Sequence, residues 1–546
     1  MKDLLQTRRL FVIILVLGLF VLAARNVTDP DVWWHLRTGQ LIIQNHRLFH
    51  VDPYSFTQAG QPWVDHEWLS QILIFDLYRL AGWGGLIAGF AAIITLTFLL
   101  VFLRCAGRPY VAGAIATWGA IASVPSWGVR PQIFTLLLAS IFLLILERSD
   151  QRPNLLWWTP PLMLLWVNLH AGYAVGVALL VMFLVGDALD RAFGDQISLA
   201  RFQRLGWVLI ACLAVVPLNP YGTAMYRYPL ETLHSRAMLA YIGEWASPDF
   251  HQGRYLAALL MMLATILLPA LSPRRLRPRE LLLLAVTTYA ALRSVRHIPI
   301  YVLVAVPLLS AMVQERLQQT GKSGLFDRPL PLSRVKLAVN VMLLAGFLVF
   351  VAIRLRYVID RQPEAEVKEF PTAAVTFLTS ARPLAPMMNH YNWGGYFIWT
   401  LYPQYEVYID GRADLYGDSF LDEFAWAYYV KGELWRQPLE KWGPQTVVLP
   451  PDAPLVTALG TLPGWRQVFS DPQAVVLTRA AQKSSGVAFS VPKFPYLTAP
   501  APDLRNYRYQ GNRSFPGNAQ QIVAPSTPAR SIMSRGLSNL SRFASY

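Results

Sequence analysis

Long apolar runs are the feature that most constrains how this chain of 546 residues can fold. The runs "RLFVIILVLGLFVLAA", "GLIAGFAAIITLTFLLVFL" and "KLAVNVMLLAGFLVFVAI" are long enough, or nearly so, to cross a hydrocarbon core about 30 Å thick. Only 15% of the residues are charged, whereas a soluble protein of this size would carry about a quarter. The sequence therefore predicts a polytopic α-helical membrane protein. The first run lacks a small-x-small cleavage site, so we interpret it as a retained span and not a signal peptide.

The apolar runs predict about eleven transmembrane spans, with a further amphipathic segment before the second one. The spans lie near residues 10–25, 84–103, 110–125, 131–147, 155–168, 172–189, 205–217, 255–271, 281–293, 298–313 and 336–353. The stretch "EWLSQILIFDLYRLAGW" carries Asp76 and Arg79. We expect it to form an interfacial or half-inserted helix.

The distribution of basic residues predicts the orientation of these spans. With the N-terminus in the cytoplasm, the inner loops receive "KDLLQTRR", "RRLRPR" and the basic loop 316–336, while the longer outer loops hold fewer basic residues. We therefore expect a multi-pass protein of a bacterial cytoplasmic (inner) membrane with its N-terminus in the cytoplasm. This topology also explains the net charge of +15, so we expect no nucleic-acid partner.

The outer loops hold nearly all the unusual polar residues. They contain "DPDVWWHLRTG", "WVDHEWL", "SWGVRPQ", "WVNLHAGY", "LNPYGTAMYRYPLETLH", "IGEWASPDF" and "RSVRHIP". Ionisable groups at membrane depth are costly and usually face a cavity with a function. The clustering on one side predicts a single site there, covered by long loops.

The chain changes character after the last span. We predict three parts: a transmembrane domain at 1–355 whose outer loop 26–83 carries interfacial helices, an extracytoplasmic α/β domain at 360–482, and a disordered basic tail at 483–546. Strands are predicted at "APMMNHYN", "YEVYIDG", "QTVVLP", "WRQVFSD" and "AVVLTRA". Helices are predicted at "PTAAVTFLTSA", "NWGGYFIWTLY", "DEFAWAYYVKGELW" and "APLVTALGTL".

Two motifs in this domain are interpreted as features that specify the fold. Asp410-Gly411 is a turn signal after a predicted strand, and Arg412 is expected to pair with a neighbouring carboxylate. The Gly394-Gly395 pair allows the close approach of a ligand.

The first outer loop begins with two acids around a proline. Asp29 fits an N-cap and Pro30 a first helical residue, which places Asp31 in the first turn. Asp31 and His35 then share one face of the helix. Trp33 and its neighbour at position 34 are interpreted as interfacial anchors. Because an anchoring helix needs neither a second acid nor a histidine, Asp31 and His35 are the candidate catalytic residues, with Asp29 assisting.

A second acidic motif, "WVDHEWL", precedes the amphipathic segment. Asp65 is expected to cap this helix and Glu67 to lie in its first turn, with His66 between them. Together with the first pair of acids they offer carboxylates suited to Mg²⁺ or Mn²⁺, although no ligand spacing is diagnostic and the use of a metal stays open.

Cations at the outer ends of spans are candidates for binding a phosphate. These are Arg130, Arg293, Arg296 and His297. The alternative is that they anchor helix ends as snorkelling side chains. Further candidates for contacts with a substrate or a metal, or for polar groups of the core, are Asn168, His170, Asn219, Tyr221 and Glu244.

The arrangement of one span followed by an outer loop with acids resembles the GT-C superfamily of integral membrane glycosyltransferases. The resemblance covers residues 1–353 and rests on "DPD" (Asp29, Asp31) and more loosely on "DHEWL". The series "VRPQ … NLHAGY … LNPYG … EWASPDF … VRHIP … WGGY … DGRADLYG" is also similar to bacterial membrane proteins described as glycosyltransferase-like. The chain departs from the protein mannosyltransferases and aminoarabinose transferases, which have a His-Pro-Pro-type motif at "DHEW", and it lacks the Trp-Trp-Asp motif of oligosaccharyltransferases.

The resemblance implies a transferase that moves a sugar from a polyprenyl-phosphate donor to an extracytoplasmic glycan, lipid or protein. Asp31 would be the base, Asp29 would assist, and Arg296, His297 and Arg130 would hold the lipid phosphate. Two other functions stay open: a non-catalytic membrane scaffold that binds a partner through its C-terminal domain, and a lipid or polysaccharide transporter. A scaffold has no need for a polar cavity that joins Asp31 to Arg296, so such a cavity discriminates between scaffold and enzyme.

Overall fold

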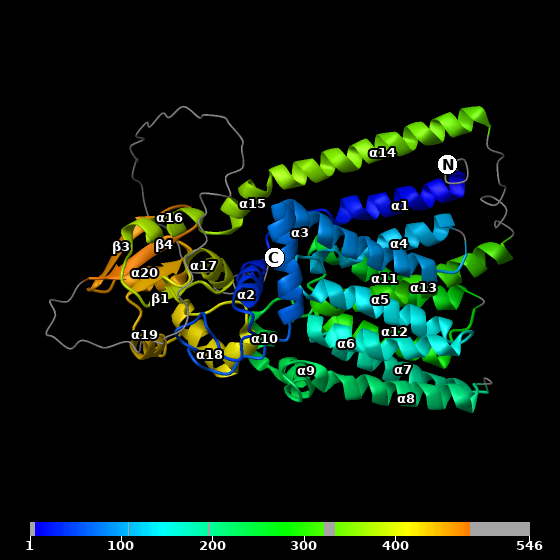
Figure 1. Cartoon of the computed structure of the whole chain (residues 1–546), viewed down its shortest axis with the longest axis horizontal. Helices are drawn as coiled ribbons and strands as arrows, with labels where there is room; N and C mark the ends of the chain where they lie inside the picture. The colour runs from blue at the N-terminus through cyan, green and yellow to red at the C-terminus, as the bar shows by residue number, and fades with distance from the viewer. Residues whose placement is uncertain (1–5, 108, 195–196, 273, 321–332, 481–546) are drawn as a thin grey trace.

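The computed structural model describes the chain except for residues 1–5, 108, 195–196, 273, 321–332 and 481–546, so the predicted tail 483–546 lies outside the described residues. Its long helices lie side by side in a bundle, and a smaller unit of helices and strands lies at one end of this bundle (Figure 1). A helix overlaps each of the predicted spans. These helices are α1 (Thr7–Ala23), α3 (Trp68–Arg104), α4 (Pro109–Ser123), α5 (Gln132–Arg148), α6 (Thr159–Leu169), α7 (Tyr173–Ala192), α8 (Leu199–Val215), α11 (Leu256–Leu271), α12 (Pro278–Arg293), α13 (Ile298–Gln319) and α14 (Arg334–Asp360).

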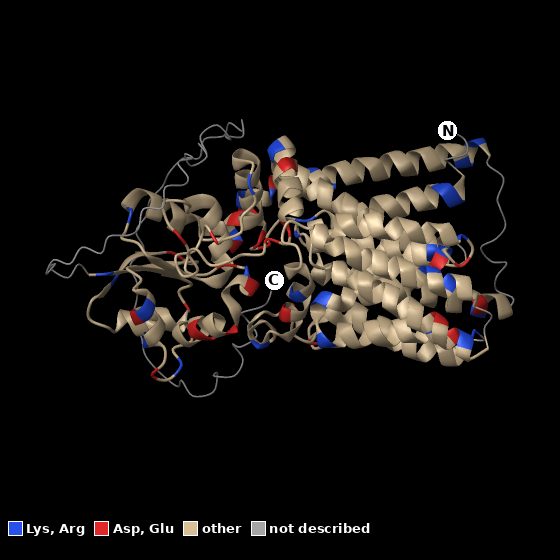
Figure 2. Cartoon of the chain, turned by 60° about the horizontal axis from the view of Figure 1, so that its bottom comes forward, with Lys and Arg blue, Asp and Glu red and all other residues tan. Residues whose placement is uncertain are grey.

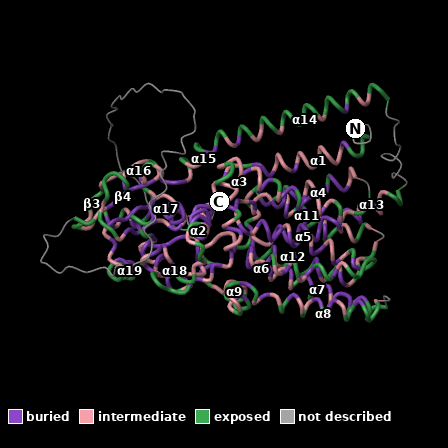
Figure 3. The backbone as a smooth tube through the Cα atoms, viewed as in Figure 1, coloured by how far each residue is buried: buried purple, intermediate pink, exposed green. Residues whose placement is uncertain are grey.

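The composition of the bundle is that of a helical membrane protein. Within the described ranges, six helical segments are long and apolar enough to cross a membrane. Charged residues gather at the two ends of the bundle and are sparse between them (Figure 2). Large apolar side chains are exposed on its outside, on α8, α11 and α14 among others. α14 lies along the edge of the bundle beside α1, and its most apolar stretch buries no residue (Figures 1 and 3). Such a surface suits a hydrocarbon environment.

The amphipathic segment before the second span is the first part of α3. Ala81 and Gly82 have non-helical backbone angles, and the φ of Gly82 is +54°, a conformation that glycine adopts without strain. This kink lets residues 68–80 run across the end of the bundle, while the rest of α3 enters it (Figure 1). Gly39 of α2 (Val32–Asn45) packs against the backbone of Gln71, so the two short helices lie in close contact.

The prediction that the tryptophans of the first loop are interfacial anchors is wrong. Trp33 is 1% exposed, and its ring makes edge contacts with Trp83, Phe370 and Tyr396. Trp34 is also buried. The C-terminal unit covers α2, so side chains that would otherwise face the interface become core residues between the bundle and that unit.

The C-terminal unit is built around a four-stranded mixed sheet of order β1-β2-β4-β3. β1 (Met387–Asn389) pairs parallel with β2 (Thr446–Leu449) in the register Met388↔Val447, and the other two pairs are antiparallel. The remaining elements are β3 (Trp465–Ser470), β4 (Val475–Arg479), α15 (Gln362–Glu369), α16 (Thr372–Ala381), α17 (Gly394–Leu401), α18 (Ala413–Tyr428), α19 (Arg436–Trp442) and α20 (Pro454–Gly460).

The strand predicted at "YEVYIDG" does not form, because other groups satisfy its backbone. The side chain of Asn389 accepts from Tyr408 N and donates to Ile409 O, at 2.8 and 2.7 Å. The N–H of Val407 donates to Tyr54 O of the first outer loop. The helix predicted at "DEFAWAYYVKGELW" begins earlier than expected, as α18, and ends at Tyr428.

Gly394 and Gly395 permit a close approach of backbone and not of a ligand. A Cβ atom on Gly394 would overlap Ile409 O, and one on Gly395 would lie 2.5 Å from Pro30 O. The glycine pair therefore allows α17 to pack closely against residues 409–410 and against the start of α2.

Candidate functional site

The two acids of the first loop converge at the N-terminus of α2, but not in the predicted positions. α2 begins at Val32, so Asp31 and not Asp29 is its N-cap, and the predicted first-turn position of Asp31 is wrong. Asp29 Oδ1 accepts a hydrogen bond from Asp31 N at 2.9 Å and thereby forms the turn that leads into the helix. Asp31 Oδ1 accepts from Trp34 Nε1 at 3.2 Å.

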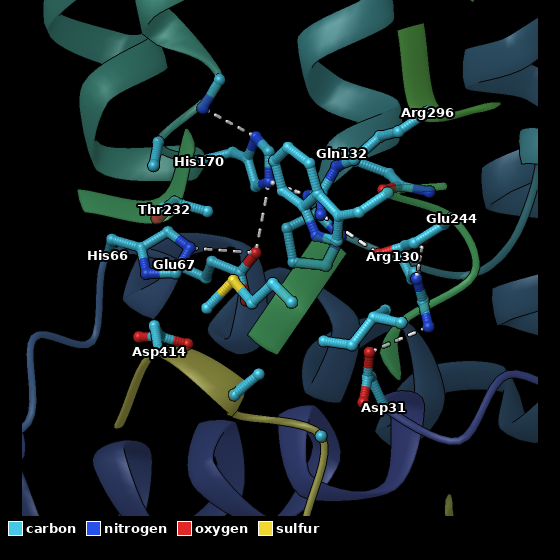
Figure 4. A pocket seen from close by; sticks show the side chains of 18 of the residues that line it. Asp31, His66, Glu67, Arg130, Gln132, His170, Thr232, Glu244, Arg296 and Asp414 are labelled. Carbon is cyan, nitrogen blue, oxygen red and sulfur yellow. Dashed lines mark hydrogen bonds and ion pairs between the residues drawn. The ribbon is translucent and has the colours of Figure 1, made fainter. Parts of the chain in front are cut away.

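Arg130 joins both acids to a third one. Its Nε pairs with Asp29, its Nη2 lies 2.9 Å from Asp31 Oδ2, and its Nη1 lies 2.7 Å from Glu244 Oε2. Glu244 Oε1 in turn lies 3.1 Å from Arg296 Nη1 (Figure 4). The planar fork of a guanidinium is suited to several carboxylates at once. Loops from four separate parts of the sequence are therefore linked by one chain of ion pairs.

Asp31 and Arg296 line the same cavity, which has a volume of about 300 Å³ and lies between the bundle and the C-terminal unit. Its apolar wall includes Leu136, Val175 and Ile300 from α5, α7 and α13. A second cavity of about 140 Å³ lies on the other side of Arg130 and Glu244, and Asp29 lines this smaller cavity. The Arg130–Glu244 pair therefore forms part of the wall between two cavities.

The C-terminal unit completes the wall of the larger cavity. Gly411 packs against Asp31, since a Cβ atom at this position would overlap Asp31 Oδ1. Arg412 is buried, and its Nη1 lies 2.7 Å from Asp52 Oδ1 while its Nη2 lies 2.6 Å from Asp410 Oδ2. The expected pairing of Arg412 with a carboxylate is thus present, and it ties the first outer loop to the C-terminal unit.

Burial and the surrounding charges shift the pKa values of the acids in opposite directions. Burial raises the pKa of Asp31 to about 7; Arg130 opposes this shift, and the negative charges of Asp29 and Glu244 add to it. Burial also raises the pKa of Asp29. For Glu244 the effect of burial is outweighed by Arg130 and Arg296, which hold its pKa below the usual value. Asp31 is therefore the acid of this group that is poised to exchange a proton near neutral pH.

A second cluster, the Glu67 cluster, lies in the same cavity and contains Glu67, His66, His170 and His35. Glu67 Oε1 lies 3.4 Å from both His66 Nε2 and His170 Nε2, and Glu67 Oε2 lies 3.7 Å from His35 Nδ1. His35 therefore turns toward Glu67, although it also lines the cavity with Asp31.

The expected helix start in this motif is wrong. α3 begins at Trp68 with Glu67 as its N-cap residue, and the Glu67 side chain makes no capping bond. Asp65 Oδ1 instead accepts from Gln71 Nε2 at 2.6 Å. Burial raises the pKa of Asp65 to about 7, although His66 opposes this shift.

The four predicted phosphate-binding cations have different positions. Arg296 stacks over the Trp245 ring, with its guanidinium carbon 5.0 Å from the ring centroid, and Nη2 lies 3.3 Å from His170 Nε2. His297 also lines the cavity, and burial, with Arg296 adding, lowers its pKa to about 4, so it is neutral. Arg130 is occupied by three acids. Arg293 is exposed at the end of α12 and is not among the residues that line either cavity.

Three of the other polar candidates make structural contacts near the cavity. Asn168 accepts from Trp68 Nε1 at 3.1 Å, Asn219 donates to Val167 O at 2.8 Å, and Tyr221 donates to Phe49 O at 2.6 Å. None of the three lines the larger cavity as the structure describes it.

The sequence interpretation missed several residues of the cavity. Tyr228 packs its ring 4.1 Å from that of His66, and its hydroxyl lies beside Asp414, whose pKa burial raises. Tyr391 also lines the cavity. Asp414 belongs to the motif "DGRADLYG", which stands out in the sequence. Nothing in the sequence, however, indicates that this motif lies next to the first outer loop.

Solved structures with a similar fold include an archaeal oligosaccharyltransferase. The archaeal oligosaccharyltransferase AglB from Archaeoglobus fulgidus, in complex with an inhibitory peptide and a dolichol-phosphate, superposes with a TM-score of 0.51 and 12% sequence identity over 80% of this chain and 69% of that one. The same oligosaccharyltransferase tethered to an acceptor peptide containing the NVT sequon also gives a TM-score of 0.51 at 12% identity, over 82% of this chain and 69% of that one. ArnT from Cupriavidus metallidurans bound to undecaprenyl phosphate gives 0.45 at 16% identity, over 86% of this chain and 98% of that one.

No protein-family model and no curated protein sequence matches the chain. The structural similarity to the oligosaccharyltransferase confirms the fold that the resemblance of the sequence implies. The chain is a helical membrane protein with a GT-C-like fold.

Proposed function

We propose that the protein is a membrane glycosyltransferase that moves a sugar from a polyprenyl-phosphate donor to an extracytoplasmic acceptor. The observation that carries this proposal is the shared cavity: Asp31, an acid with a pKa raised to about 7, and Arg296 line one space at the end of a membrane bundle. A scaffold has no need for such a cavity. The dolichol-phosphate in the similar archaeal structure supports a lipid phosphate as the donor class.

Asp31 is the proposed general base. One oxygen is held by Trp34 and the other by Arg130, so the carboxylate has a fixed orientation at the edge of the cavity. As an acceptor hydroxyl attacks the anomeric carbon, Asp31 takes its proton and the bond from that carbon to the phosphate oxygen breaks. A single displacement inverts the configuration at the anomeric carbon.

Arg296 and His297 are the proposed ligands of the departing phosphate. Arg296 shares only Glu244 among the described acids as an ion-pair partner, whereas Arg130 is bound by three carboxylates. Arg296 therefore supplies positive charge, and neutral His297 supplies a hydrogen bond. Arg130 organises the acids instead of binding the phosphate, and Asp29 holds Arg130 from the side of the smaller cavity.

The proposed topology has eleven membrane crossings, the N-terminus in the cytoplasm and the C-terminal α/β unit outside the inner membrane. It is supported by the basic inner loops and by a helix at each predicted span. The cavity then opens on the side where a lipid-linked donor and an extracytoplasmic acceptor can meet.

The test compares cell-envelope glycans, glycolipids and glycoproteins by mass spectrometry in four strains. These are a deletion strain and the same strain carrying the wild-type gene, Asp31→Asn or Asp249→Asn, the last being an exposed acid outside both cavities. We expect a glycan that is lost on deletion to return with the wild type and Asp249→Asn only. Loss of a general base lowers rates by about 10²–10⁴-fold. Full recovery with Asp31→Asn, present in the membrane at wild-type level, would overturn the assignment of the base. A deletion that changes no glycan would overturn the function.

A further inference from the structure

The Glu67 cluster is not used in the proposed transfer. Single ligand atoms of His66, Glu67 and His170 all lie within 4.8 Å of one another. Glu67 and His170 are buried, and His66 is half-buried. The residues come from the loop before α3 and from the turn between α6 and α7, so the bundle itself fixes their spacing.

The rings are oriented as metal-binding histidines usually are, with one nitrogen held and the other turned to the ion. His66 Nδ1 lies 3.4 Å from Val64 O, which leaves Nε2 toward Glu67. His170 Nδ1 lies 2.9 Å from Thr135 Oγ1, and Thr135 is itself held by Trp166 Nε1 at 3.0 Å. Gly172 N also donates to His170 Nδ1. Binding an ion through Nε2 would place the ring proton on Nδ1, which would then donate to Thr135 Oγ1, and the Gly172 N–H would have to turn away.

His35 provides an independent observation. It is 1% exposed, and its Nδ1 atom is buried without a hydrogen-bond partner among the described residues. This atom lies 3.7 Å from Glu67 Oε2, so it faces the cluster. A buried nitrogen without a partner costs free energy unless something satisfies it, and a fourth bond to an ion would do so.

The ligand atoms of the cluster indicate which metal ions it can bind. Of the four carboxylates that the sequence suggested for Mg²⁺ or Mn²⁺, Asp29 and Asp31 are neutralised by Arg130, and Asp65 accepts a hydrogen bond from Gln71. Glu67 is left among the histidines. Imidazole nitrogens with one carboxylate suit Zn²⁺ and its first-row neighbours, whereas Mg²⁺ prefers oxygen.

We propose that His66, Glu67 and His170, with His35 as a further ligand, bind one transition-metal dication, with Zn²⁺ as the best match. The cluster lines the larger cavity next to Arg296, so an ion held by it would add positive charge beside that arginine. This inference goes beyond the proposed transfer and does not depend on it.

The test uses the full chain purified in detergent with a tag that lacks histidine and without chelators. Elemental analysis is expected to find about one zinc ion per chain. Replacement by Co²⁺ is expected to give visible d–d absorption, whose intensity reports the coordination number and geometry of the bound ion. Glu67→Gln and the pair His66→Ala/His170→Ala are expected to lose the metal and the absorption. His251→Ala, an exposed histidine outside both cavities, is expected to keep both.

Folding of each variant is checked by its elution as a single species and by its thermal unfolding. Zinc added back after chelation is expected to raise the unfolding temperature of the wild type and not of Glu67→Gln. The proposal is overturned if the wild type binds no metal after zinc is added. It is equally overturned if Glu67→Gln, folded as the wild type is, keeps the metal and the Co²⁺ spectrum.

Discussion

At the scale of single residues, Arg130 determines how the acids can coexist. Burial lowers the pKa of Arg130, but the charges of Asp29, Glu244 and Asp31 together raise it well above its ordinary value, so the guanidinium stays charged. Without this cation the three partly buried carboxylates would repel one another. The Arg130 side chain thus acts as the counter-ion of the three acids.

Arg130→Met is expected to destabilise the protein by about 3 kcal/mol, because it leaves buried acids without their counter-ion. The measurement is thermal unfolding of the purified protein in detergent. Arg79→Met is the matched control, since Arg79 forms an exposed pair with Asp76, and such pairs contribute about 0–1 kcal/mol. Equal unfolding temperatures for the two variants would contradict the counter-ion role.

The raised pKa of Asp31 predicts how transfer depends on pH. A general base must be deprotonated, so the rate is expected to fall about tenfold per unit as pH drops below about 7. The groups that face Asp31 are Asp29, Glu244 and Arg130, together with Tyr391 from the C-terminal unit. Glu244→Gln removes one negative charge, so the acidic limb of the profile is expected to move to lower pH.

The raised pKa of Asp31 also predicts how the free energy of unfolding depends on pH. The folded pKa lies above the unfolded one, so the folded state binds more protons and the contribution of Asp31 to stability falls as pH rises between about 4 and 7. Asp31→Asn is therefore expected to unfold at no lower temperature than the wild type at pH 8.

The rate prediction has its own contradicting outcome. A transfer rate of the wild type that is flat between pH 5 and 8 would contradict the assignment of Asp31 as the base.

Single residues of the site could be predicted from the sequence, but their partners could not. Asp31, Arg130 and Arg296 stood out because ionisable residues are rare in an apolar chain, and the unusual ones gather in the outer loops. Their mutual contacts join positions that no local pattern relates; Arg130 and Glu244 are 114 residues apart. Long-range pairing depends on the fold as a whole.

At the scale of elements, apolar run length was sufficient to locate the helices of the bundle. Prediction from composition failed for segments whose contacts come from a distant part of the chain. The segment 405–411 has the composition of a strand, yet the amide of Asn389 and the first outer loop take its backbone hydrogen bonds. The tryptophans of α2 have the composition of an interfacial belt, yet the C-terminal unit covers them.

Gly411 shows how a segment without regular secondary structure can position the carboxylate of Asp31. A Cβ atom here would overlap Asp31 Oδ1, while the backbone of Gly411 is not in a left-handed conformation. Gly411→Ala is therefore expected to displace Asp31 and lower the transfer rate at least about tenfold, with a loss of stability of about 1–3 kcal/mol. Gly253→Ala, where the added atom meets open space, is the matched control. Wild-type kinetics for Gly411→Ala would show that Asp31 is not held by this contact.

At the scale of the whole molecule, the C-terminal unit and the bundle form one site. The Asp52–Arg412–Asp410 cluster joins residues 360 positions apart, and the C-terminal unit lies against the end of the bundle where α2 and the first part of α3 are found (Figure 1). The cavity has walls from both parts. The C-terminal unit must therefore lie on the same side of the membrane as the outer loops.

This requirement predicts the topology of the chain in the cell. In a background with Cys105→Ala and Cys212→Ala, Glu433→Cys places a thiol on an exposed position of the C-terminal unit, and Arg9→Cys places one at the opposite end of the bundle. A membrane-impermeant maleimide added to spheroplasts is expected to label the cysteine at 433 and to label the one at 9 only after permeabilisation. The positive-inside bias gives the direction, because translocating the basic inner loops is unfavourable. The opposite pattern would invert the topology, and labelling of both positions in intact spheroplasts would contradict an odd number of membrane crossings between them.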